Sequence, residues 1–212
     1  MKYRHILFDI DGTLIDTEQM LMTVFSEVLQ RRYGYHLTTE TFRSTFGIPC
    51  DAALRLMGLE PDQEVMDDIQ RGIRASLNLA RVFPEVEPLL EELYDYGITL
   101  GVVTSKNREE FNSSFVPFGL AHYFSAAICS GDTPRGKPYP DPILHYLSAQ
   151  KADPGETVYI GDTLYDYQCA RGAGVDFILA AWSGIVLADK PDTPTAKSIR
   201  QLREILMEAS HT

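Results

Sequence analysis

Cysteine is scarce in this chain. Its 212 residues include three cysteines, namely Cys50, Cys129 and Cys169. The number is odd and the three lie far apart, outside any Cys-x-x-Cys pair, so the sequence indicates neither a disulfide framework nor a zinc site. We therefore expect three buried free thiols.

Long apolar segments are also missing. No apolar run approaches the roughly 20 residues that cross a bilayer. The N-terminal residues 1–5 are basic, and the apolar segment of a signal peptide does not follow them. We expect a cytoplasmic protein that does not associate with a membrane.

Clusters of lysine and arginine are absent as well. The chain has 19 Lys and Arg residues against 30 Asp and Glu residues, a formal net charge of −11. This charge repels a phosphate backbone, so we expect no nucleic-acid partner. A small anion can still bind where a metal ion or a local cation offsets the field. The oligomeric state cannot be inferred from the sequence.

What is present is an ordinary globular composition, with 44% hydrophobic and 23% charged residues. From Glu18 to about Arg32 apolar residues recur at helical spacing, and helix signals continue to residue 82, with Thr39, Asp51 and Pro61 as expected helix starts. Beyond residue 83, helices alternate with short continuous apolar runs. That alternation is typical of a parallel sheet covered on both faces.

The pattern predicts an α/β fold with two parts. The first is a Rossmann-like, doubly wound parallel sheet core, formed by residues 1–16 and 83–212. The second is an inserted all-helical domain, formed by residues 17–82. Because the insertion follows the first strand directly, it stands beside the end of that strand, where a lid would stand.

The first strand ends in two carboxylates. The apolar run Ile6 to Phe8 is followed by Asp9 and Asp11, and then by Gly12. One alternative is a simple turn, because Asp and Gly favour turns. A calcium-binding loop is excluded, since Leu14 and Met20 occupy the positions that require Gly and Glu. The carboxyl end of a strand is where open α/β sheets bind ligands.

Polar residues also follow three later apolar runs. They are Thr104 and Ser105, then Lys137, and then Asp162 with Asp166. Each has an ordinary alternative, because helix caps and solvated surface lysines are common. Their joint occurrence at the ends of parallel strands favours one shared crevice with Asp9.

One apparent motif is rejected. Residues 131–137 satisfy the first seven positions of a nucleotide-binding P-loop. The next position requires Ser or Thr, but it is Pro138, and Pro134 removes an amide donor from the loop.

These motifs together resemble those of the haloacid dehalogenase-like hydrolase superfamily, and more closely its phosphoglycolate phosphatase-like branch. The matching segments are Asp9 to Thr13, Thr104 with Ser105, Lys137 within residues 136–142, and Gly161 to Asp166. The resemblance implies that the helical insertion is a cap domain. The dehalogenases lack the second aspartate of the first motif, so Asp11 implies phosphoryl transfer and a small phosphorylated metabolite as substrate.

The resemblance also implies a role for each site residue. The catalytic residues would be Asp9 as nucleophile, Asp11 as acid and base, with Thr13 orienting it, and Lys137 as counter-charge. The Mg²⁺ cofactor would be held by the carboxylates of Asp9 and Asp162 and the main-chain carbonyl of Asp11, with Asp166 outside the ligand set. The phosphoryl oxygens would be bound by Gly12, Thr104, Ser105 and Lys137.

Three alternatives to a phosphatase remain, two of them enzymes that act on phosphorylated compounds and one a protein without catalysis. They are a phosphomutase, a pyrophosphatase and a non-catalytic protein that binds a phosphorylated ligand. Thr13 favours hydrolysis over the mutase, because the mutases of this superfamily tend to have an aliphatic residue there. Specificity is expected in the cap, around residues 46–49, and the candidate clamps for a second anionic group are Arg43, Arg55, Arg71 and Arg74.

Overall fold

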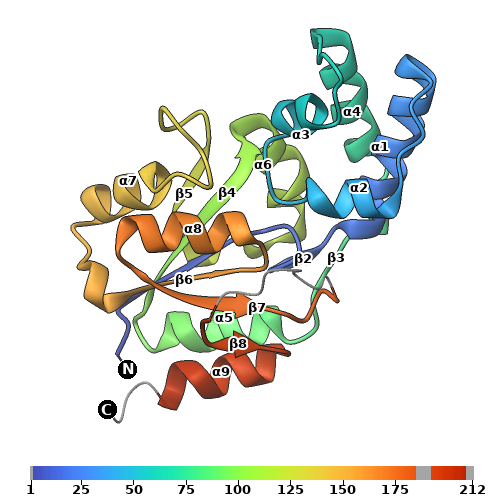
Figure 1. Cartoon of the computed structure of the whole chain (residues 1–212). Helices are drawn as coiled ribbons and strands as arrows, with labels where there is room; N and C mark the ends of the chain where they lie inside the picture. Colours follow the sequence, from blue (N-terminus) through green and yellow to red (C-terminus); the bar gives the residue numbers. More distant parts are fainter. Residues whose placement is uncertain (1, 185–191, 209–212) are drawn as a thin grey trace.

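Six parallel strands form the central sheet of the computed structural model, which describes residues 2–184 and 192–208 (Figure 1). The strand order is β5-β4-β1-β6-β7-β8, and each neighbouring pair is parallel. The strands are β1 (His5–Phe8), β4 (Thr99–Asn107), β5 (Phe124–Ser130), β6 (Thr157–Gly161), β7 (Asp176–Ala180) and β8 (Thr195–Ala196).

The central strand β1 is buried on both faces. Ile6 and Phe8 point into one hydrophobic cluster, and Leu7 points into the other. This alternation follows from the two-residue period of a strand, and burial on both faces explains the continuous apolar run.

Helices cover both faces of the sheet, so the predicted doubly wound α/β fold is confirmed (Figure 1). Residues of α7 and α8 belong to the cluster that contains Leu7, whereas residues of α5, α6 and α9 belong to the cluster that contains Phe8. The bounds are α5 (Val86–Asp95), α6 (Arg108–Ser114), α7 (Asp141–Gln150), α8 (Leu164–Ala173) and α9 (Ile199–Glu208). Short 3₁₀ turns lie at η2 (Val116–Phe118), η3 (Leu120–Tyr123) and η4 (Pro154–Glu156).

A group of helices, here called the helical lobe, lies between β2 and β3 in sequence (Figure 1). It consists of α1 (Glu18–Tyr33), α2 (Thr39–Ser44), α3 (Cys50–Leu56), α4 (Gln63–Ala75) and the 3₁₀ turn η1 (Leu77–Leu79). The expected helix starts are each displaced. Thr38 and Asp62 cap α2 and α4 through their side chains, and Pro49 precedes α3.

The insertion is not helical throughout, which corrects the expectation for residues 17–82. Arg81–Val82 forms strand β3, which pairs antiparallel with β2 (Ile15–Asp16). Ile15 pairs with Val82, and Asp16 pairs with Arg81. Strands of two residues are too short to show a periodic pattern in the sequence.

The expectation for the cysteines holds for two of the three. Cys129 and Cys169 are buried, whereas Cys50 is partly exposed, and all three thiols are free. Within the described residues, no helix combines the length and the apolar character that crossing a membrane requires.

Candidate active site

The ends of three adjacent strands meet at one edge of the sheet. Phe8, the last residue of β1, pairs with Val102 of β4 and with Ile160 of β6. Asp9 therefore follows β1 in the middle of the edge, and Asp162 follows β6 beside it. Both carboxylates are buried, with 2% of each residue exposed.

Lys137 reaches this edge from the segment between β5 and α7. Its Nζ lies 2.8 Å from Asp9 Oδ1 and 2.6 Å from Asp166 Oδ1, and the lysine is buried with both partners. Burial lowers the pKa of Lys137, but the charges of Asp166 and Asp9 outweigh it and raise the pKa overall. The ammonium ion is therefore a fixed positive charge beside Asp9.

The carboxylates at this edge outnumber the positive charge of Lys137. One oxygen each from Asp9, Asp162 and Asp166 lies within 4.8 Å of the others. Burial raises the pKa of Asp9 to about 7, against the opposing effect of Lys137. Burial and the charge of Asp9 raise the pKa of Asp162 as well. An additional cation would favour the ionised form of both groups.

The partners of the carboxylates show which of them fit a metal ion. Asp162 Oδ2 is buried and has no hydrogen-bond partner within the described part of the chain. Asp166, in contrast, accepts from Lys137 and Tyr159 through Oδ1 and from Thr163 through Oδ2. Buried acceptors without a donor suit a hard cation such as Mg²⁺. Asp162 thus fits a metal site, whereas the oxygens of Asp166 are occupied by donors and Asp166 orients Lys137.

Gly12 lets the turn after β1 approach Asp162 closely. Its φ is +77°, and a Cβ atom at this position would overlap the carboxylate of Asp162. The turn is closed by a hydrogen bond from the Gly12 amide to the Ile15 carbonyl, at 2.8 Å. Only glycine meets both requirements, positive φ and close approach.

We expect Gly12→Ala to lose most activity and more than about 2 kcal/mol of stability. The left-handed conformation alone costs alanine about 1 to 2 kcal/mol, and the displaced Asp162 adds to this cost. Gly97→Ala is the matched control, because Gly97 has φ +75° and a Cβ atom added there would meet nothing within 4 Å. Urea denaturation and an activity assay of both variants test the prediction. Equal effects would show that the contact with Asp162 is unimportant.

The helical lobe contacts the strand ends through Gly47. Ser105 Oγ donates to the carbonyl oxygen of Gly47 at 2.7 Å. A Cβ atom on Gly47 would lie 2.6 Å from Thr163 Cγ2, so this loop passes closely over the start of α8. The neighbouring Thr104 is buried, and its Oγ1 accepts from the amide of Lys106 at 3.2 Å.

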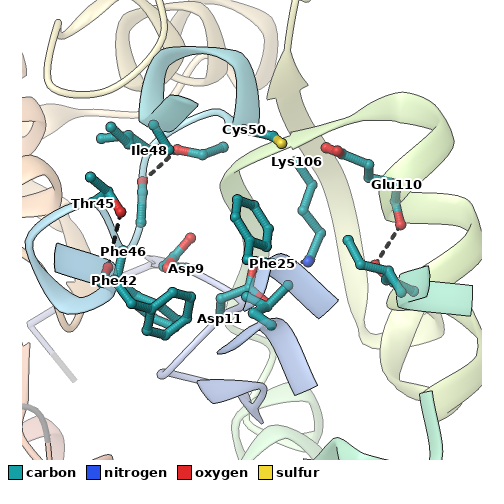
Figure 2. Close-up of a pocket in the computed structure, with 16 residues that line it drawn as sticks. Asp9, Asp11, Phe25, Phe42, Thr45, Phe46, Ile48, Cys50, Lys106 and Glu110 are labelled. Carbon is teal, nitrogen blue, oxygen red and sulfur yellow. Dashed lines mark hydrogen bonds and ion pairs between the residues drawn. The ribbon is translucent and has the colours of Figure 1, made fainter. Parts of the chain in front are cut away.

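Asp9 and Asp11 line a pocket of about 70 Å³ between the sheet edge and the helical lobe (Figure 2). Most of its other walls are apolar or aromatic side chains, and its polar walls include Lys106 and Glu110. Among residues 46–49, the loop contributes Phe46, Gly47 and Ile48. The lobe therefore supplies much of the pocket surface that faces the carboxylates.

The four candidate arginine clamps do not line this pocket. Each is paired with a carboxylate elsewhere: Arg43 with Glu18, Arg55 with Asp51, Arg71 with Asp68 and Arg74 with Glu109. Exposed helical arginines find partners on neighbouring turns and helices, which explains the difference from the expectation.

The lysine that lines the pocket is Lys106, to which sequence reasoning gave no role. It is buried near the end of β4, and its Nζ lies 2.9 Å from Asp11 Oδ2. The one feature of the sequence that could have pointed to Lys106 is its position, as a charged residue near the end of an apolar strand. Thr13 also differs from expectation, since its hydroxyl faces Asp162 Oδ1, at 3.5 Å, instead of Asp11.

The chain thus has an α/β fold with a buried carboxylate and lysine cluster at the sheet edge beneath a helical lobe. Residues 6–180 match the family model of the haloacid dehalogenase-like hydrolases, and the chain belongs to this family.

Individual relatives cover most of the chain. It is 32% identical to "Putative pyrophosphatase PpaX" of Caldanaerobacter subterraneus, over 91% of this chain and 90% of that protein. It is 30% identical to pyrophosphatase PpaX of Oceanobacillus iheyensis, over 86% of each chain. A crystal structure of a "putative phosphoglycolate phosphatase" from Lactobacillus plantarum is similar at a TM-score of 0.87 and 28% identity, over 99% of this chain and all of that one.

Proposed function

We propose that this hydrolase is a magnesium-dependent, phosphoglycolate phosphatase-like enzyme that hydrolyses a small phosphomonoester through an aspartyl-phosphate. The observation that carries the proposal is the buried contact of Asp9 with Lys137 at the end of the central strand. The proposed domains are a core of residues 1–16 and 83–212 and a cap of residues 17–82.

Asp9 is the proposed nucleophile. Lys137 holds its carboxylate at the pocket floor and offsets the repulsion between this anion and an anionic phosphoryl group. A bond forms between a carboxylate oxygen of Asp9 and phosphorus as the bond from phosphorus to the leaving oxygen breaks. The covalent step divides one difficult displacement into two easier ones.

Asp11 is the proposed acid and base. Its carboxylate lines the same pocket as Asp9, and the ion pair with Lys106 fixes its position. In its protonated form it gives a proton to the departing alkoxide. As the carboxylate, it then takes a proton from the water that attacks the aspartyl-phosphate, which releases inorganic phosphate. Such proton transfer contributes about 10²- to 10⁴-fold to the rate.

The remaining residues hold the phosphoryl group and the metal ion. The hydroxyl of Thr104, the amides near Gly12 and Ser105, and the Lys137 ammonium are the proposed donors to the phosphoryl oxygens. Mg²⁺ would be held by the Asp9 and Asp162 carboxylates and the main-chain carbonyl of Asp11, and when bound it neutralises phosphoryl charge.

We expect the purified protein to release inorganic phosphate from small monoesters in the presence of Mg²⁺. Excess EDTA should stop release, because the Asp9 and Asp162 carboxylates then lack their counter-ion, and added Mg²⁺ should restore it. A panel of small phosphorylated acids, sugar phosphates, nucleotides and pyrophosphate tests this in one assay. Turnover that persists in EDTA would contradict the metal requirement.

Three other functions are separated by the same panel. A pyrophosphatase is favoured by the names of two relatives, and it would release phosphate from pyrophosphate in preference to the esters. A phosphomutase would consume substrate without a matching release of phosphate. A non-catalytic protein that binds a phosphorylated ligand would release none from any compound.

A further inference from the structure

Lys106 has unused hydrogen-bonding capacity. Lys106 lines the pocket, and its ammonium ion is paired with Asp11 Oδ2. Within residues 2–184 and 192–208, this oxygen is the single side-chain acceptor in contact with the ammonium ion. A lysine ammonium ion has three donors, so two remain for another group. Figure 2 shows the side chain extending from β4 toward Asp11.

Glu110, the nearby carboxylate on α6, does not use these donors. One of its oxygens accepts from the Gln70 side chain, and the other accepts from the amide of Asn107 at 2.7 Å. The Lys106 ammonium ion therefore keeps donors that no neighbouring carboxylate uses.

The surroundings of Lys106 would make this cation selective. It is the one lysine, arginine or histidine among the described residues that line the pocket. The apolar walls include Phe25, Phe42 and Phe46. An anionic group that leaves water for this pocket needs a charged partner, and an apolar group there would leave the lysine donors unsatisfied.

We propose that Lys106 forms a subsite for a second anionic group, a carboxylate or a phosphoryl group, on the leaving portion of the substrate. The proposal rests on the proposed phosphatase function. Since Asp11 is the proton donor to the leaving oxygen and contacts Lys106 directly, the second anion would lie close to that oxygen.

The test compares two non-hydrolysable ligands of similar size, phosphonoacetate and ethylphosphonate, in the presence of Mg²⁺. Calorimetry should show tighter binding of phosphonoacetate to the unmodified protein. Lys106→Met should weaken phosphonoacetate binding by about 10- to 100-fold, the usual range for hydrogen bonds to charged groups. It should change ethylphosphonate binding little. Lys106→Arg should keep the preference, and Lys197→Met, which removes an exposed charge, should behave as the unmodified protein.

Turnover supplies a second measurement with 2-phosphoglycolate, pyrophosphate and ethyl phosphate. Lys106→Met should lower kcat/KM for all three compounds, because it removes the ion pair that positions Asp11, and by about a further 10- to 100-fold for the two compounds with a second anion. The larger of the two additional losses identifies whether that anion is a carboxylate or a phosphoryl group. An equal loss on all three would show that Lys106 serves Asp11 alone and would overturn the subsite. Equal binding of both phosphonates by the unmodified protein would overturn it too. If no compound is hydrolysed but the phosphonate preference depends on Lys106, the phosphatase proposal fails and the anion subsite stands.

Discussion

Asp9→Asn is expected to lower kcat by about 10⁵- to 10⁶-fold, the scale seen when a catalytic nucleophile is removed. The amide cannot form the aspartyl-phosphate, and it has no negative charge to pair with Lys137, which lies 2.8 Å from Asp9 in the native protein. Single-turnover measurements with a labelled monoester should detect no phosphoprotein. Substantial remaining turnover would contradict the covalent mechanism.

Asp11→Asn is the matched control for this variant. It removes one carboxylate from the same pocket and leaves the nucleophile in place. We expect a loss of about 10²- to 10⁴-fold, which is the usual contribution of a general acid or base. Phosphoprotein should accumulate when the second step slows more than the first. Wild-type rates would exclude Asp11 as the acid and base.

Lys137→Met is expected to reduce stability by about 3 to 5 kcal/mol and to abolish measurable turnover. The lysine side chain is 1% exposed, and the side chains of its partners Asp9 and Asp166 are 3% and 0% exposed. Removing a buried cation leaves the two carboxylates close together without a counter-charge, and such losses fall in this range. Urea denaturation and the phosphate-release assay measure the two effects.

Tyr159→Phe is the control for the lysine variant. The Tyr159 hydroxyl accepts from Lys137 Nζ at 3.3 Å, and its single proton has two acceptors in reach, the Val103 carbonyl at 2.9 Å and Asp166 Oδ1 at 2.8 Å, so its removal weakens the same network without altering any charge. We expect a loss of about 1.5 to 3 kcal/mol, the range for hydrogen bonds to charged groups, and smaller than that for Lys137→Met. Equal stability losses for the two variants would show that the charge of Lys137 contributes little.

Sequence reasoning was most successful where the signal was local. A continuous apolar run that stops at Asp9 or at Gly161 marks the end of a buried strand, and parallel strands place such ends at one edge. Because of this rule, the chain order alone predicted that Asp9, Asp11 and Asp162 meet, and the structure brings them together with Lys137. Their catalytic and metal-binding roles stay predictions.

The environment of the pocket could not be predicted in the same way. Contacts such as Ser105 with Gly47 and Lys106 with Asp11 join segments distant in sequence, and neither has a periodic or spacing signal. The positions of the candidate arginines outside the pocket could not be predicted for the same reason, since their charge was visible in the sequence but their carboxylate partners were not.

The pairing of β2 with β3 joins the two chain connections between the helical lobe and the sheet. The chain leaves the core through Ile15 and Asp16 and returns through Arg81 and Val82, and these four residues face one another, with Arg81 and Asp16 ion-paired at 3.1 Å. The outgoing and returning crossings therefore form a single ribbon. Any rigid-body displacement of the lobe would have to bend or twist this ribbon, because both covalent connections of the lobe pass through it.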